Sequence, residues 1–154
     1  MSIRGITFQE QAVRPEDDGK LYTAIFNDGI IHGCAFSSAG YTLTMNAGHI
    51  IACGRQLKAT TQNFAMDGAS EGYARLLLKI DLNQKATETE FKQIEPVVEY
   101  ALAENGFAEP LQPDINDGIS TVYELPLAVC SLSGNGISKI IKTLAQAEFK
   151  EGSD

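Results

Sequence analysis

The stretch "IFNDGIIHGCAF", residues 25–36, decides whether the chain is interpreted as a β domain or as a metal or thiol site. Its Asn-Asp-Gly tripeptide at 27–29 has the composition of a short hairpin turn, in which glycine adopts a positive φ without steric cost. His32 and Cys34 follow two residues apart, which places both side chains on one face of a strand. We interpret the stretch as a β-hairpin whose second strand carries His32 and Cys34 as ordinary strand residues.

More strands are predicted on the C-terminal side of this hairpin. Residues 41–46, "YTLTMN", alternate apolar and polar side chains, as a half-buried strand does. Residues 49–60 are predicted as one strand with a kink or bulge at Gly54, and residues 60–66 would continue the meander. The apolar run "YARLLLKIDL", residues 73–82, has residues that also suit a helix. A long strand is preferred, because turn residues bound the run and no capping box precedes it.

The two ends of the chain add further predictions. Residues 4–9 form a short strand candidate, and residues 13–20 are predicted as a polar turn because they combine proline, acids and glycine. Residues 21–26 are predicted as the first strand of the opening hairpin. Near the C-terminus, residues 119–133 alternate like a strand, and the "GNG" that follows at 134–136 is predicted as a turn.

The helix predictions fall in the C-terminal half. Residues 91–105 place apolar side chains at helical spacing, with Pro96 at an early position and Gly106 as a C-cap. Strands broken at Pro96 are the alternative for this segment. Residues 137–149 begin as a strand or form a terminal helix, because their isoleucines and leucine recur at helical intervals.

Short strands separated by turns predict a mainly β protein, a sandwich or barrel-like antiparallel β domain with one or two short helices in the C-terminal half. The 154 residues suffice for one domain with a hydrophobic core. We expect residues 1–154 to form a single structural domain, and any subdivision would fall near residues 83–95.

The Asn-Asp-Gly tripeptide occurs twice, at 27–29 and at 116–118, and each copy precedes an isoleucine. The residues that flank the two copies do not match. We therefore interpret the copies as two similar turns and not as an internal repeat.

Composition excludes several classes of function. The chain has 12 Lys and Arg against 20 Asp and Glu, a net charge of −8, whereas a nucleic-acid surface needs clustered cations. No window approaches the about 20 apolar residues that span a bilayer, and the N-terminus lacks the apolar region of a signal peptide. Cys34, Cys53 and Cys130 are an odd number without CxxC spacing, so we expect reduced thiols.

Two His–Cys pairs raise the hypothesis of a zinc site. His32 and Cys34 are two residues apart, His49 and Cys53 are four apart, and on neighbouring strands the four side chains would form a Cys₂His₂ set. Structural zinc sites usually contain C-x₂₋₄-C knuckles, which this chain lacks. Free cysteine also behaves as a small apolar residue. We therefore favour strand residues over metal ligands and expect neither a metal nor a cofactor.

No sequence motif indicates catalysis. A cysteine nucleophile needs a nearby base and an activating position such as a helix N-terminus, and neither Cys34 nor Cys53 is predicted to have one. The chain has no G-x-S-x-G and no P-loop, and "GNG" lacks the rest of a dinucleotide fingerprint. The sequence predicts a protein that is not an enzyme and has no catalytic residues.

A small carbohydrate- or peptide-binding β module is the alternative function. Tyr22, Tyr41, Tyr73 and Tyr123 are its candidate contact residues, because exposed aromatic rings stack on sugars and peptides. We favour packing of these tyrosines in or beside the core, and the chain has no Trp to build a sugar-stacking surface.

Three segments, in order, resemble a pattern of tailed-phage structural proteins. They are "YTAIFNDGIIHGCAFSSAGYTLTMNAGHIIACGRQLK" at 22–58, "GYARLLLKIDL" at 72–82 and "VYELPLAVCSLSGNGISKI" at 122–140. The second is similar to a strand that begins Arg-Ile-Asp in that family; here Arg75 is followed by Leu76 and Leu77. The resemblance, over about residues 20–145, is to the N-terminal adaptor domain of baseplate and receptor-binding tail proteins of phages and prophages.

The resemblance implies a non-enzymatic, mostly β component of a phage tail or baseplate. It implies self-association, as a trimer or another ring, and contact with other tail or baseplate proteins, but no nucleic-acid partner and no membrane span. It also implies a location in the virion, after assembly in the bacterial cytoplasm. No catalytic residue is carried over, because the family pattern has none.

Overall fold

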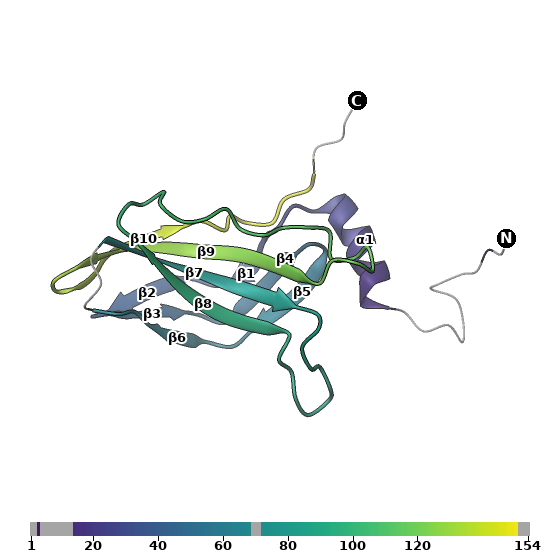
Figure 1. Cartoon of the computed structure of the whole chain (residues 1–154), viewed down its shortest axis with the longest axis horizontal. Helices are drawn as coiled ribbons and strands as arrows, with labels where there is room; N and C mark the ends of the chain where they lie inside the picture. Colours follow the sequence, from purple (N-terminus) through teal and green to yellow (C-terminus); the bar gives the residue numbers. More distant parts are fainter. Residues whose placement is uncertain (1–2, 4–13, 69–71, 151–154) are drawn as a thin grey trace.

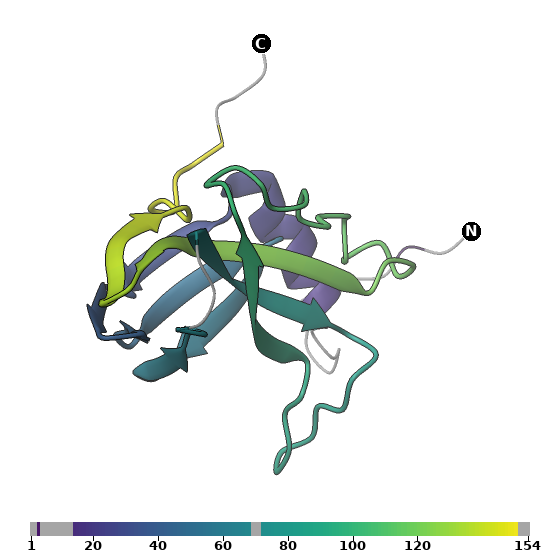
Figure 2. The same ribbon diagram turned by 60° about the vertical axis from the view of Figure 1, so that its left-hand side comes forward.

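The computed structural model describes residue 3, residues 14–68 and residues 72–150. The described residues form two packed β layers with one helix at one end (Figure 1, Figure 2). The elements are, in order, α1 (Pro15–Ile25), β1 (Gly29–Gly33), β2 (Phe36–Ala39), β3 (Thr42–Met45), β4 (Gly48–Ala52), β5 (Arg55–Ala59), β6 (Gln62–Ala65), β7 (Gly72–Asp81), β8 (Ile94–Ala101), β9 (Val122–Ser133) and β10 (Gly136–Lys142).

The first layer is a three-stranded meander that bends in the middle. Its two halves have the strand orders β1-β4-β5 and β2-β3-β6, all antiparallel. Gly33 and Cys34 both have positive φ, 74° and 60°, where β1 passes into β2. Hydrogen bonds from Cys34 N to Ala47 O and from Asn46 N to Ala35 O continue the ladder across this bend. Because of the bend, the meander can pack along the full length of the second, four-stranded layer.

A two-residue turn joins β4 to β5. Ala52 pairs with Arg55, and the two residues between them have positive φ, 48° at Cys53 and 73° at Gly54. Two consecutive positive φ values define a type I′ hairpin, the turn whose twist suits antiparallel strands. The single kinked strand predicted over residues 49–60 is therefore wrong in detail, because Gly54 reverses the chain. The predicted strand at 41–46 is confirmed as β3, and the segment 60–66 contains β6.

The second layer is a four-stranded antiparallel sheet in the order β10-β9-β7-β8. Its central strand β7 confirms the prediction for residues 73–82, and β9 and β10 form the hairpin predicted around "GNG". The register between β7 and β9 shifts at Leu76/Leu77, where Pro126 lies in β9. A bulge at this point accommodates a proline that a regular central strand would exclude.

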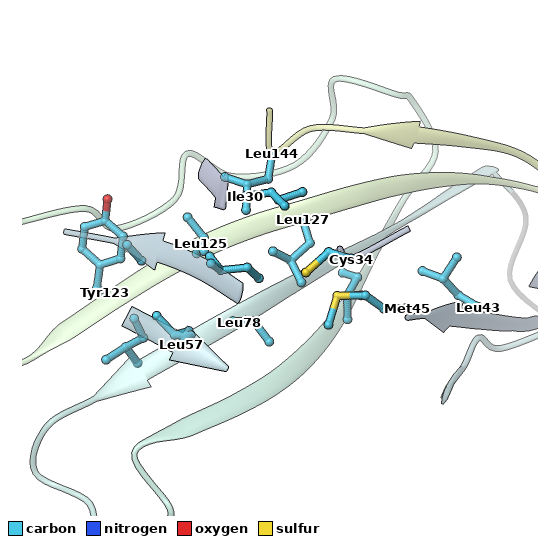
Figure 3. Packing of buried hydrophobic residues seen from close by; sticks show 14 of the residues in the cluster. Ile30, Cys34, Leu43, Met45, Leu57, Leu78, Tyr123, Leu125, Leu127 and Leu144 are labelled. Atoms are coloured by element: carbon cyan, nitrogen blue, oxygen red, sulfur yellow. The ribbon is translucent and has the colours of Figure 1, made fainter. Parts of the chain in front are cut away.

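The core lies between the two layers (Figure 3). Alternate residues of β7 and β9 point into it, as the two-residue period of a strand requires. Buried apolar side chains that fill it include Ile30, Leu43, Met45, Ile50 and Leu57 from the meander and Leu76, Leu78, Ile80, Tyr123, Leu125 and Leu127 from the four-stranded sheet.

One side of the sandwich is closed by the segment after β10. Ile30 N donates to Ala145 O, Ala147 N donates to Ile30 O, and the rings of Phe26 and Phe149 stack 4.9 Å apart. On the opposite side, β8 pairs only with β7 among the described residues. The fold is therefore a sandwich of antiparallel sheets and not a closed barrel. This confirms the mainly β prediction.

The helix α1 corrects two predictions, the polar turn at 13–20 and the strand at 21–26. Pro15 begins the helix and Glu16, Asp17 and Asp18 lie in its first turn, where acids are favourable beside the helix dipole. These residues also suit turns, which is why the sequence was misinterpreted. The tripeptide at 27–29 consequently links a helix to β1, so the predicted hairpin around it is wrong.

The second correction concerns residues 91–105. The predicted helix is the strand β8, so the strand alternative was right, and 137–149 begins with the strand β10. Pairing with β7 along eight positions outweighs the helical spacing of the apolar side chains. Among the described residues the one helix is N-terminal, not in the C-terminal half. The strand predicted at 4–9 lies outside the described residues.

We expect Gly54→Ala to lower the free energy of unfolding by more than about 3 kcal/mol. Its φ is 73°, and an added Cβ would lie 2.0 Å from the main-chain oxygen of Gly19 in α1. Gly40→Ala is the matched control, because Gly40 also has a positive φ of 58° but its Cβ would meet nothing within 4 Å. That control should lose only about 1 kcal/mol in urea denaturation. Equal losses would contradict the tight α1 contact.

Candidate functional site

The structure brings two of the four zinc candidates together. His32 on β1 lies opposite His49 on β4, and His49 Nδ1 is 2.7 Å from His32 Nε2. The two rings meet edge to face, with centroids 4.7 Å apart. The His32 side chain is exposed and that of His49 is half-buried, so the pair lies on the outer face of the meander.

The two cysteines do not join this pair. Cys34 is 1% exposed and belongs to the core, where Figure 3 shows its sulfur among apolar side chains near Met45 and Leu127. Cys53 lies in the turn at the far end of β4. In the part of the chain that the structure describes, no three His, Cys, Asp or Glu residues group as metal ligands. The Cys₂His₂ set is therefore not assembled.

The most connected polar group of residues surrounds the main chain of Cys53. Cys53 N donates to Asp28 Oδ1 over 2.8 Å, and Asn116 Nδ2 donates to Cys53 O over 2.8 Å. Asn116 is 1% exposed, and its Oδ1 also accepts from Arg55 Nε at 3.1 Å. Asp28 and Asn116 come from the two Asn-Asp-Gly tripeptides. The repeated tripeptide was therefore the sequence signal for this cluster, although it gave no sign that both copies meet one turn.

Tyr123 completes this cluster from β9. Its hydroxyl donates to Asp28 Oδ2, so that both carboxylate oxygens of Asp28 accept hydrogen bonds. Burial raises the pKa of Tyr123 well above its usual value, and the hydrogen bond to Asp28 and the negative charge of Asp28 raise it further. The phenol therefore stays protonated and acts as a donor. Its hydrogen bond to Asp28, called the Tyr123–Asp28 clasp below, joins the α1–β1 link to the second sheet.

A depression of about 540 Å³ opens above these residues. Burial is the largest cause that raises the pKa of the Cys53 thiol, and the carboxylates of Asp114 and Asp28 also raise it. Thiolate is the nucleophilic form of cysteine, so these surroundings favour an inert thiol. The residues that line the depression are Thr23, Phe26, Asn27, Asp28, Cys53, Gln112, Pro113, Asp114, Tyr123 and Lys150.

Arg75 is a buried charged residue to which sequence reasoning gave no role in the site. It lies on the outer face of β7 and is 7% exposed. Its Nε and Nη2 donate to Glu99 Oε1 on β8, at 2.9 and 2.6 Å, and its guanidinium lies 5.1 Å from the ring centroid of Phe107. The pair joins β7, β8 and the loop before β9. These partners are distant in sequence, so no local pattern could have indicated them.

The four candidate tyrosines do not converge on one surface. Tyr123 is buried, and the Tyr41 hydroxyl donates to the main-chain oxygen of Ser133. Tyr22 lines a groove of about 420 Å³ between α1, β5 and the end of β7, while Tyr73 lies near the start of β7. A shared aromatic platform for a sugar or peptide is therefore not formed by these four side chains.

Comparison with known proteins adds no assignment: no protein-family model matches the chain, and no curated protein matches it. Among the residues that the structure describes, no helix has the length and apolar character to cross a membrane. The interpretation of the site therefore depends on its own geometry.

Native thiol labelling tests the inert character of the three cysteines. Burial raises the pKa of Cys34 and Cys53, and it raises that of Cys130 to about 11. We expect a chromogenic disulfide reagent to label the folded protein at least about 100-fold more slowly than the protein in urea, because labelling requires local opening. One fast-reacting thiol in the folded protein would contradict this expectation.

Tyr123→Phe should lower the free energy of unfolding by about 2 kcal/mol near pH 7, because Asp28 loses a donor in a partly buried place. The variant should also change the alkaline pH dependence. Since the folded-state pKa is raised, the unfolded chain loses the proton first, and wild-type stability declines above about pH 10.

Removal of the hydroxyl should make that decline shallower in urea denaturation series at pH 7 to 11. Tyr22→Phe is the matched control, since no hydroxyl hydrogen bond of Tyr22 is found within the described residues. Parallel pH profiles for wild type and Tyr123→Phe would show that the clasp does not stabilise the fold.

Proposed function

We propose that the protein is a non-enzymatic structural component of a phage or prophage tail or baseplate, which acts as an adaptor by oligomeric assembly in the virion. The resemblance of three segments to tail adaptor domains supports the proposal. These segments correspond here to the end of α1 with β1 to β5, to β7 and to the β9–β10 hairpin, in the same order. Apart from the helical residues at the start of the first segment, all three lie in the two sheets, as expected of motifs that serve architecture.

The structural observation that favours assembly is the outer edge of β8, which has no partner strand among the described residues. Asp81 N donates to Gln93 O, and with the register of the two strands this shows that the odd-numbered residues of β8 form hydrogen bonds with β7. Main-chain groups alternate along an antiparallel strand, so the even-numbered residues from Ile94 to Tyr100 direct theirs away from β7. Pro96, which has no N–H, occupies one of these outward positions. The other outward groups offer hydrogen bonds to a strand of another subunit.

The inert surroundings of the Cys53 cluster agree with a role in architecture. Its phenol and thiol are both held in their protonated forms, and the Asp28 carboxylate is occupied by two donors. The alternative of a small carbohydrate- or peptide-binding module has less support, because its four tyrosines are dispersed. A glycan array with specific hits would favour that alternative.

Light scattering coupled to size-exclusion chromatography tests assembly directly. We expect a mass that is a whole multiple of 16.6 kDa and that rises with concentration. Val98→Pro should shift the protein towards the monomer, because it removes an outward N–H at the centre of the edge. Melting followed by circular dichroism shows whether this variant is folded.

Glu88→Pro is the matched control, because Glu88 is exposed in the loop between β7 and β8, in a turn closed by the Thr87–Glu90 hydrogen bonds. This control should assemble as the wild type does. A wild-type protein that stays strictly monomeric at high concentration would count against the proposal. Assembly that Val98→Pro leaves unchanged would exclude β8 as the contact edge.

A further inference from the structure

The two histidines of the chain are brought together by a β-bulge. The β1–β4 register begins with Gly29 opposite Ile51 and Ile30 opposite Ile50, then shifts so that His32 faces His49. Ile31 is the extra residue. Without the shift, Ile31 would face His49. A bulge changes the direction in which a side chain points and interrupts the regular hydrogen-bond ladder. Bulges are frequent next to functional sites.

The two facing nitrogens share one proton and could instead bind one metal ion between them. His49 Nδ1 and His32 Nε2 are 2.7 Å apart, so one nitrogen donates and the other presents a bare lone pair. A metal ion between two imidazoles lies about 2.1 Å from each, so ligands at a right angle are about 3 Å apart. To admit an ion that prefers right-angled ligands, the two nitrogens must move about 0.3 Å farther apart. Both rings must also turn, so that their lone pairs point at the ion and not at each other.

The short separation of the two nitrogens favours ions whose ligands stand close together, because these need the smaller movement. Tetrahedral zinc places its ligand nitrogens about 3.4 Å apart, farther than the right-angled positions of Ni²⁺ or Cu²⁺. Imidazole nitrogen suits both of these ions, and a site that supplies two protein ligands leaves the remaining positions to water. We propose that His32 Nε2 and His49 Nδ1 form an open two-histidine site for a divalent transition-metal ion of the Ni²⁺ and Cu²⁺ class.

The residues around the two histidines supply a positive charge but no third metal ligand among the described residues. Lys58 on β5 lies opposite His49, with its side chain exposed on the same face, and adds a positive charge. No third His, Cys, Asp or Glu completes a ligand group within the described residues, and the Cys34 sulfur lies in the core. The site is therefore a surface site with two protein ligands, and it does not depend on the proposed assembly.

Proton NMR of the wild-type protein, without any histidine tag, tests the site first. Because the chain has two histidines, its imidazole region contains signals from only two rings. Paramagnetic Ni²⁺ added below one equivalent should broaden the signals of both rings together. Ni²⁺ is chosen because Cu²⁺ would also oxidise thiols. Broadening of one ring only, or of neither, would overturn the proposal without any variant.

Calorimetric titration with Ni²⁺ then tests each ligand. His32→Gln and His49→Gln should each weaken Ni²⁺ binding by at least about tenfold, because each removes half of the protein ligands. Lys58→Gln is the matched control, because Lys58 lies directly opposite His49 on β5. This variant should bind Ni²⁺ as well as the wild type or more tightly. Equal affinity of the wild type and the His32→Gln/His49→Gln double variant would overturn the proposal.

Discussion

The main chain of Cys53 is the point on which the relative placement of helix and sheets depends. Its φ of 48° is unfavourable for a residue with a Cβ, and type I′ turns usually place Asn, Asp or Gly there. Asp28 accepts from its N–H and Asn116 donates to its carbonyl, and these bonds offset that local strain. Because the partners come from the α1–β1 link and the loop before β9, this one turn holds two segments that are distant from it in sequence.

The sequence predicts best the strands whose burial is decided locally. In β3 and β9 apolar and polar side chains alternate, and the long apolar run of β7 is bounded by turn residues, so each is recognisable without its partners. The helix α1 was missed because Pro15 and its acids suit a turn equally well. The role of Gly19 is tertiary, because it lets α1 approach Asn116, where a Cβ would lie 2.2 Å from Oδ1. No pattern within residues 13–26 carries that information.

The candidate site was predictable only in part, for a geometric reason. Spacing of two places His32 and Cys34 on one face of a regular strand, but β1 ends at Gly33, and the positive φ at Gly33 and Cys34 turns the thiol into the core. The register shift at Ile31 brings side chains together where the bend separates them, because it places His32 opposite His49. Two irregularities within four residues thus separate the cysteine from the histidine and pair the histidines. Neither irregularity can be read from alternation alone.

The β8 edge restricts which pairing between two copies would be acceptable. Only even-numbered residues direct main-chain groups outward, so antiparallel hydrogen-bonded pairs join even positions. A two-fold axis at Pro96 would place two residues without N–H opposite each other, and an axis at Val97 would place Glu95 opposite Glu99 of the second copy. An axis at Val98 avoids both, because Glu95 then faces Ala101. Proline and acids on this edge therefore discourage indiscriminate strand addition while leaving one register favourable.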